Sequence, residues 1–251
     1  MNLNTKVRLL QTVNYLLSIL ALVIMDTNYL IITLISWFLI GHFSTIVTLH
    51  RLLTHRSFKT YKWLEQFMCY LSVYSTVGPT ISWVALHRMH HQHSDKDDDP
   101  HSPYIKGKFN MLQAIKVFFG YDWKIPNIPV NYVKDLMRDK THKIIFNHYF
   151  KIILTGVIVL AIIDPLLVLY CYCLPATLTV MTIGIVNTFG HGHGYRNHDT
   201  IDNSTNSWIA SIISLGEGWH NNHHARPNNY YVGERWYEFD ILGLIIKVIK
   251  T

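Results

Sequence analysis

Histidine is the residue type in this chain whose number and spacing could do chemistry, since 16 of the 251 residues are histidine. Two boxes share the spacing His-x-x-His-His, with His87–His91 reading HRMHH and His220–His224 reading HNNHH. Residues three and four apart lie on one face of a helix, so each box is expected to direct three imidazoles at one volume. Histidine is the commonest side-chain metal ligand, and an imidazole-rich site suits iron, copper, zinc or nickel. The boxes therefore predict a metal site.

The third histidine cluster is a pair, His50 and His55, with four residues between them. On a continuous α-helix these two side chains point ~140° apart, so the helix must bend or end before both can reach one site. Chance clustering in a histidine-rich chain is the alternative reading, but it does not readily produce two boxes together with a spaced pair. We expect all three clusters to meet at the metal site.

Long apolar stretches flank these clusters and must position them. Hydrophobic residues make up 49% of the chain, whereas charged residues are only 15%, well below the soluble average. Each stretch has roughly the 17–25 residues that a helix needs to cross a bilayer. The break Asp26-Thr27-Asn28 separates the first pair, and Asp164-Pro165 and Pro175 mark the far-side connection of the second. The sequence predicts an all-α membrane protein with four spans in two hairpins, at about 9–25, 29–49, 150–169 and 174–190.

The segments between and after the two hairpins are expected to form a helical cap, 50–149 and 191–251, in a single domain covering 1–251. Within the cap, 63–86 is apolar but broken by Gly78-Pro79, so it is a poor candidate for a span. We further expect a loop over 93–103, a surface helix over 111–119, a connector at 125–130 and an interfacial helix over 241–249. The three cysteines have no paired framework spacing and are read as free thiols.

The basic residues are distributed unevenly along the chain. Residues 51–143 supply 14 of the 22 Lys and Arg, and neither break between paired spans, 26–28 or 164–175, contains any. This bias predicts that both termini, the cap and every histidine box are cytosolic. It also accounts for the formal charge of +6 without a nucleic-acid partner.

The ordered set of motifs resembles the integral-membrane fatty acid desaturases, and most closely the delta-9 acyl branch, the stearoyl-CoA desaturase family in the broad sense. The matching stretches are HRLLTHR from His50, HRMHH from His87 with a following Asp99-Pro100-His101, NTFGHGHGYR from Asn187, and GEGWHNNHH from Gly216. Any one box is shared with hydroxylases and other membrane di-iron enzymes, whereas the ordered set covers nearly the whole chain and is specific.

This resemblance implies a di-iron centre of two Fe²⁺ ions that uses O₂ as co-substrate. Carried over residue by residue, the ligands are His50, His55, His87, His90, His91, His191, His220, His223 and His224, and Asn187 holds a metal-bound water. His191 belongs to no box; it is selected by the resemblance and lies one helical turn after Asn187.

The remaining polar residues have less specific readings. His93, His101, His142, His148, His193 and His198 are expected at the surface or behind the ligands. Glu217 is either a hydrogen-bond partner of a ligating imidazole or a solvated turn residue. The run Asp97–Asp99 is expected in a solvated loop.

The resemblance implies oxygen-dependent introduction of a cis double bond, at delta-9, into a saturated fatty acyl chain carried by CoA or a lipid. An unactivated methylene offers no acidic hydrogen and no leaving group, so the metal supplies the reactivity and the protein supplies placement. Bond position must then come from the shape of a substrate tunnel. Leu34, Phe38 and His42 on the second span are candidate tunnel residues, with Phe38 hypothesised to limit chain length; ordinary helix packing is the competing reading.

Two features bear on partners. Ala85-Leu86 stands before the second box where animal acyl-CoA enzymes carry Arg-Asp, and the lead-in resembles bacterial and cyanobacterial members, some of which use lipid-linked chains. The membrane and cap sequences are expected to take up the full length, so the two electrons should come from a separate ferredoxin or cytochrome b5 type protein. The rival reading is a membrane di-iron hydroxylase or ketolase acting on another lipid such as a carotenoid. A non-enzymatic membrane metal-binding protein is the third.

Overall fold

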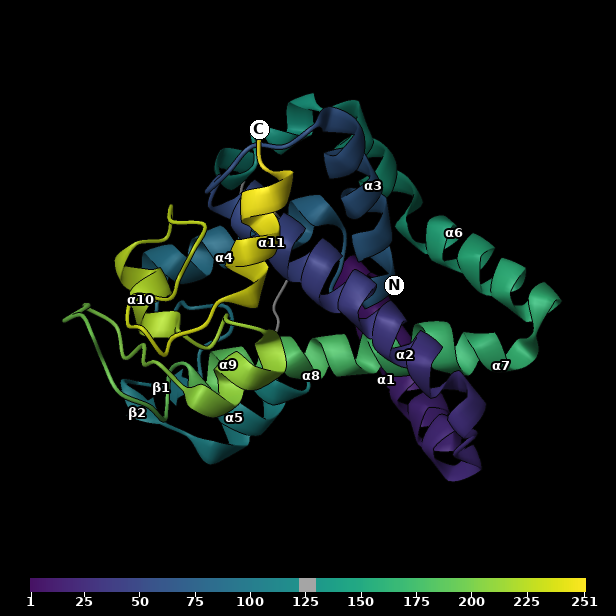
Figure 1. Cartoon of the computed structure of the whole chain (residues 1–251), viewed down its shortest axis with the longest axis horizontal. Helices are drawn as coiled ribbons and strands as arrows, with labels where there is room; N and C mark the ends of the chain where they lie inside the picture. Colours follow the sequence, from purple (N-terminus) through teal and green to yellow (C-terminus); the bar gives the residue numbers. More distant parts are fainter. Residues whose placement is uncertain (122–129) are drawn as a thin grey trace.

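The computed structural model describes residues 1–121 and 130–251, and it is almost entirely helical (Figure 1). All but the last residue of the predicted connector at 125–130 lies outside the described residues. A short antiparallel hairpin joins β1 (Tyr104–Ile105) to β2 (Lys108–Phe109). The helices, in chain order, are α1 (Leu3–Ile24), η1 (Thr27–Tyr29), α2 (Leu30–Trp37), η2 (Phe38–Thr54), α3 (Lys62–Ser72), η3 (Val73–Ser75), α4 (Thr80–His93), α5 (Met111–Phe118), η4 (Val130–Tyr132), η5 (Leu136–Arg138), α6 (Lys140–Ile163), α7 (Pro165–Leu167), η6 (Val168–Cys173), α8 (Leu174–Phe189), α9 (Trp208–Ser214), α10 (His220–Ala225) and α11 (Ile241–Ile249).

Four continuous helices are long and apolar enough to cross a membrane, as the sequence predicts. They cover Leu3–Ile24, Thr27–Thr54, Lys140–Ile163 and Pro165–Phe189. The predicted bounds of the second pair, 150–169 and 174–190, are displaced: the third helix begins and ends earlier, and the break between the two is Asp164 alone. Its carboxylate accepts a hydrogen bond from the Leu166 amide at 2.9 Å, so the next helix starts at once with Pro165 in its first turn.

Pro175 lies inside the fourth of these helices rather than in a connection, which corrects the expectation of a break there. The π-helical turn η6 comes directly before it. Local π adjustments of this kind satisfy backbone groups that a proline would otherwise leave unpaired in a membrane helix. The helix therefore continues through α8 to Phe189 and delivers Asn187 at its end.

The helix that carries the first histidine pair is π-helical from Phe38 to Thr54. π-Helices are usually single turns and are frequent at functional sites. The hydroxyls of three threonines on η2 each donate to the carbonyl five residues earlier, Thr45 to Ile40 among them, at 2.7–3.2 Å. The amide of His55, which caps the helix, donates in the same register to His50 at 3.1 Å. Because i→i+5 pairing makes five residues about one turn, His50 and His55 face the same way.

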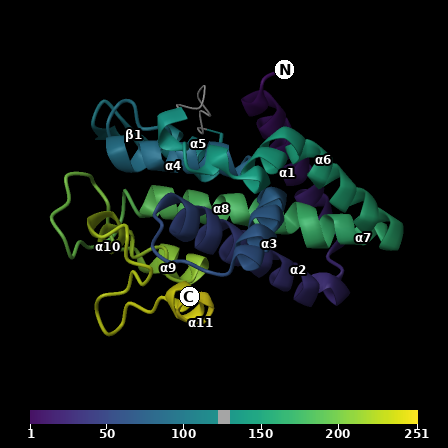
Figure 2. The ribbon, with the colours of Figure 1, turned by 90° about the horizontal axis from the view of Figure 1, so that it is seen from above.

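The cap elements surround the end of α8. α8 packs against α1, η2, α5 and α9, and it lies between the α4–α5 side and the α9–α11 side of the molecule (Figure 2). The segment around Gly78-Pro79 does break the apolar stretch 63–86 into α3 and α4, and α4 carries the second box. The short helices predicted at 111–119 and 241–249 are confirmed as α5 and α11, and all three cysteines are free.

Candidate metal centre

Five histidines from three parts of the chain form one cluster, called here the five-histidine group. Their ligand atoms lie within 4.8 Å of one another. Nε2 of His223 lies 3.0 Å from Nε2 of His50 and 3.1 Å from that of His91, and the Nε2 atoms of His91 and His87 are 3.2 Å apart. The members are His50, His55, His87, His91 and His223.

Four further histidines form a second cluster, called here the four-histidine group, again with ligand atoms within 4.8 Å. Nε2 of His220 lies 3.1 Å from Nε2 of His191 and 3.0 Å from that of His224. The members are His90, His191, His220 and His224. The two groups adjoin, because the rings of His91 and His224 stack with their centroids 4.4 Å apart.

The split runs through each box, which corrects the expectation that a box serves one volume. His87 and His91 are four residues apart and enter the five-histidine group together, while His90 enters the other group. Likewise, His220 and His224 share the four-histidine group and His223 does not. Successive helical residues point about 100° apart, so the i,i+4 pair shares a face and the remaining histidine points across to the neighbouring cluster.

The chemistry of the donor set fits two bound metal ions. Carboxylates can only accept hydrogen bonds, so an imidazole that bonds one through Nδ1 carries its proton there and turns a bare lone pair outward on Nε2. Imidazole nitrogens converge in both groups, and a cation between them would relieve the repulsion between their lone pairs. Nε2 of His55 and of His90 are buried and have no hydrogen-bond partner among the described residues. Imidazole nitrogens without a donor to bind suit a transition-metal ion such as iron.

Four carboxylates hold ligand-group imidazoles through Nδ1. Glu217 bonds His50 at 2.6 Å in the five-histidine group. In the four-histidine group, Asp99 bonds His90 at 2.9 Å, Asp95 bonds His191 at 2.9 Å, and Asp202 bonds His224 at 2.6 Å. Partners of this kind fix the tautomer and orientation of a ligating histidine and raise its basicity.

Several of these neighbours were not selected by sequence reasoning, or were read differently. Glu217 is 2% exposed, so its reading as a solvated turn residue is wrong. Asp99 is also wrong as a solvated loop residue, because its side chain is buried against His90. The sequence did not identify Asp95 and Asp202 as partners of His191 and His224, because both lie far from these histidines in the chain. The one available signal was that the segments between the histidine clusters must lead back to the metal site.

The other histidines were expected at the surface or behind the ligands, and two of them, His101 and His142, are buried. His101 is buried, stacks on His90 at 4.2 Å between centroids, and has no hydrogen-bond partner for either ring nitrogen among the described residues. His142 is buried beside α4, with Nδ1 3.1 Å from the Thr80 hydroxyl. His93 and His198 contact the carboxylates of Asp98 and Glu234, and neither belongs to either group.

Burial keeps most of these imidazoles neutral. Desolvation lowers the pKa of His55, His87, His91, His220 and His223 well below the usual value, and lowers that of His224 to about 4. His191 differs: burial lowers its pKa, but the carboxylates of Asp95, Asp202 and Asp99 together raise it by more. Neutral imidazoles are the form that binds metal.

We predict that the metal-free protein loses stability as the pH falls below about 6.5, the usual histidine pKa. Below that value the imidazoles of the unfolded chain become protonated, whereas those of the folded protein stay neutral because their pKa values are lower. Acid therefore favours the unfolded state. Each such imidazole contributes up to about 1.4 kcal/mol one pH unit below 6.5. Thermal unfolding of the metal-free protein should show a Tm lower at pH 5.5 than at pH 7.5. An equal or higher Tm in acid would contradict this.

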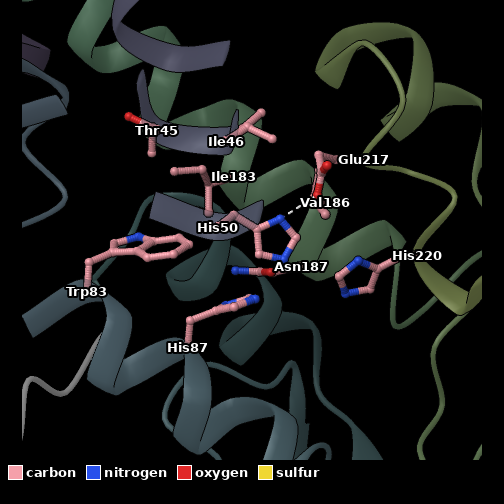
Figure 3. Close-up of a pocket in the computed structure, with 10 residues that line it drawn as sticks. All are labelled: Thr45, Ile46, His50, Trp83, His87, Ile183, Val186, Asn187, Glu217 and His220. Atoms are coloured by element: carbon pink, nitrogen blue, oxygen red, sulfur yellow. Dashed lines mark ion pairs between the residues drawn. The ribbon is translucent and has the colours of Figure 1, made fainter. Parts of the chain in front are cut away.

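A small cavity of about 30 Å³ lies against both groups, lined by Thr45, Ile46, His50, Trp83, His87, Ile183, Val186, Asn187, Glu217 and His220 (Figure 3). That volume holds about one water molecule. Asn187 is buried and lies beside His50 and His220 in this cavity. The walls away from the histidines are apolar, with Ile46 and Ile183 on helices that continue into the spans and Trp83 on α4.

The three candidate tunnel residues do not line this cavity. Leu34 is half exposed on the surface of α2. His42 is buried with Nε2 3.0 Å from the Ile213 carbonyl, and the Phe38 ring stacks on it at 6.1 Å between centroids. Their place in a substrate tunnel stays a prediction.

The chain is similar to known proteins over most of its length. The family model described as fatty acid desaturase matches residues 29–244. An sn-1 stearoyl-lipid 9-desaturase of Anabaena variabilis is 31% identical over 220 residues, which are 87% of this chain and 79% of that protein. Delta-9 acyl-lipid desaturase 1 of Arabidopsis thaliana is 34% identical over 220 residues, 84% of this chain and 69% of that protein. A hex-5-enoyl-[acyl-carrier protein] acetylenase of Moorena producens is 32% identical over 212 residues, 78% of this chain and 66% of that protein.

Proposed function

The chain belongs to the fatty acid desaturase family, and we propose that it places a cis double bond at delta-9 of a saturated acyl chain carried by a membrane lipid. It is an oxidoreductase of the oxygen-dependent desaturase type. The observation that carries the proposal is the juxtaposition of two histidine groups and one apolar-walled cavity. The lipid carrier and the bond position are supported by the printed names of the stearoyl-lipid and acyl-lipid 9-desaturases among the relatives. Ala85-Leu86 supports the carrier too, since it stands where animal acyl-CoA enzymes carry a charged pair.

The nine histidines of the two groups are the residues that would hold two iron ions, and Asn187 would hold a water in the cavity that His50, His87 and His220 also line. When bound, the iron ions supply the capacity to use O₂ and two electrons to remove two hydrogens from adjacent methylenes. The chain's own residues determine where this happens. Ile46, Ile183 and Trp83 present apolar surface beside the histidines, so they hold a methylene segment there and keep bulk water out.

The cavity is far smaller than an acyl chain, so substrate binding must move these side chains aside. We propose that the chain enters along η2 and α8, whose apolar residues run from the cavity into the membrane spans. Since all methylenes are chemically alike, the depth to which the methyl end passes the histidines would select the bond position.

The membrane arrangement is part of the same proposal. Four candidate spans make the chain a membrane protein, and we propose that they form two hairpins with a single cap, both termini and the metal centre on the cytosolic side. The uneven distribution of Lys and Arg, which are absent from the connections at 26–28 and 164–175, supports this orientation. Two electrons per turnover would come from a ferredoxin or cytochrome b5 type protein.

Expression of the chain in cells, followed by gas chromatography of their fatty acids with double-bond location, tests the proposal. A new cis delta-9 monoene is expected, and it should be absent with His223→Ala, because losing one shared ligand removes an imidazole that contacts both His50 and His91. His148→Ala, an exposed histidine on α6 outside both groups, is the matched control and should leave the product unchanged. A hydroxylated or keto lipid in place of a monoene would favour the rival hydroxylase or ketolase.

A further inference from the structure

The two histidine groups differ sharply in the charge that surrounds them. The four-histidine group has three carboxylates on its imidazoles, from Asp95, Asp99 and Asp202. None of the three forms an ion pair with Lys or Arg within 1–121 and 130–251. Their remaining hydrogen bonds come from neutral backbone amides and hydroxyls. Three negative charges therefore face this group without a Lys or Arg partner among the described residues.

Within 1–121 and 130–251, the five-histidine group has one carboxylate on its imidazoles, Glu217 on His50. That carboxylate is also bonded by the buried guanidinium of Arg51, which in turn bonds Asp240 at 2.8 Å and 3.0 Å. The negative charge of Glu217 is therefore partly compensated by Arg51. A metal dication in this group would meet five neutral imidazoles and little net negative charge.

We infer that the four-histidine group binds its metal ion more tightly than the five-histidine group and fills first. This rests on the proposed di-metal centre and goes beyond it, because it ranks the two sites. A buried dication is costly unless nearby charge compensates it, and uncompensated carboxylates on the ligating imidazoles supply that compensation. The five-histidine group offers one more nitrogen, but a fifth neutral imidazole adds no charge.

Pre-organisation acts in the same direction. Asp99 accepts from His90 and also from the amides of Asp95 and His101, at 2.8 Å and 3.0 Å. Asp202 is held by Ser204 and Thr200 while it bonds His224. Three of the four imidazoles are thus fixed through Nδ1 before metal arrives; in the fourth, His220, Nδ1 has no partner among the described residues. In the five-histidine group, His50 alone has a carboxylate from the described part of the chain on Nδ1.

The test is a titration of the full-length metal-free protein, in detergent, with Co²⁺, whose absorption reports its coordination. Two binding steps are expected. Asp95→Asn and Asp202→Asn should each weaken the tighter step by about 10- to 100-fold and leave the weaker step in place. Glu217→Gln should weaken only the second step. Asp98→Asn removes the carboxylate from His93, an imidazole outside both groups, and should change neither step.

Ligand variants assign the steps independently of the carboxylates. His191→Ala should abolish the tighter step, whereas His223→Ala should abolish the weaker one and keep the tighter. Thermal unfolding of each metal-free variant shows whether it is folded before titration. Loss of the tighter step in His223→Ala, or two steps of equal affinity in the unaltered protein, would overturn the ranking while leaving a di-metal centre intact. No Co²⁺ bound at either site would overturn the ranking and the proposed centre together.

Discussion

Replacing Arg51 by methionine should lower the free energy of unfolding by about 3–5 kcal/mol, one of the largest effects we expect from a single substitution. The guanidinium is 1% exposed and bonds the carboxylates of Glu217 and Asp240 together with the Tyr230 carbonyl. Methionine fills a similar volume but leaves two buried carboxylates facing one another without a cation. Removing one partner of a buried ionic cluster costs far more than the intact cluster contributes.

Arg56→Met is the matched control, since it is the same change five residues later on a side chain that is 65% exposed. Arg56 bonds Asp135 at 2.6 Å, and an exposed pair of this kind contributes about 0–1 kcal/mol. In thermal unfolding of the purified protein we expect the Tm of Arg51→Met to fall by roughly 10 °C and that of Arg56→Met to remain within a few degrees. Similar small shifts in both would show that the buried cluster does not stabilise the fold.

Asp240 explains why this cluster extends beyond the metal centre. Its carboxylate also accepts from the amides of Val232 and of Gly243, the latter at 2.8 Å at the start of α11. Arg51 therefore joins the helix of the first histidine pair to the C-terminal segment as well as to Glu217. The neighbouring Gly216 has a φ of 127°, and a side chain there would meet Asp240. Both observations place Asp240 at a tightly packed junction.

The sequence predicted the parts of this site that depend on local periodicity. Apolar stretches of sufficient length predicted four long helices. The spacing within each box predicted that its three imidazoles face one volume, which holds only for the i,i+4 pairs His87 with His91 and His220 with His224. Their partition between two groups was not predicted, because it depends on how α4 and α10 meet in space. His90 and His223 are adjacent to ligands of one group and belong to the other.

The first pair could not be placed from sequence for a different reason. In an α-helix the side chains of His50 and His55 would point in different directions. The residue types of η2 do not predict that its seventeen residues form a π-helix. The widened register is a tertiary property that threonine hydroxyls support, such as Thr54 donating to the Leu49 carbonyl at 2.8 Å. The carboxylates Asp95 and Asp202 were inaccessible to spacing arguments as well, because their histidines lie 96 and 22 residues away.

Replacing Ile183 by tryptophan should reduce desaturation at least about 100-fold while the metal centre remains intact. Ile183 lies on α8 four residues before Asn187 and lines the cavity beside the histidines, together with Trp83 and Ile46 (Figure 3). An indole there takes the space through which a methylene must reach the centre, and displacement of a reacting group by about 1 Å can cost 10²-fold in rate. Ile183→Leu conserves volume and should retain most of the activity.

The measurement pairs product formation with metal content of the same purified protein, because the prediction requires the two to separate. Equal metal content with little monoene from Ile183→Trp places the acyl chain in this cavity. Full activity would move the chain to the larger apolar cavity of about 450 Å³ between η2, α3, α6 and η6, which Ile40, Tyr74 and Gly156 help to line. Gly156→Leu would then be the blocking change, since a side chain there meets the Tyr74 ring. Whichever of the two variants blocks desaturation without loss of metal therefore identifies the route by which a methylene reaches the histidines.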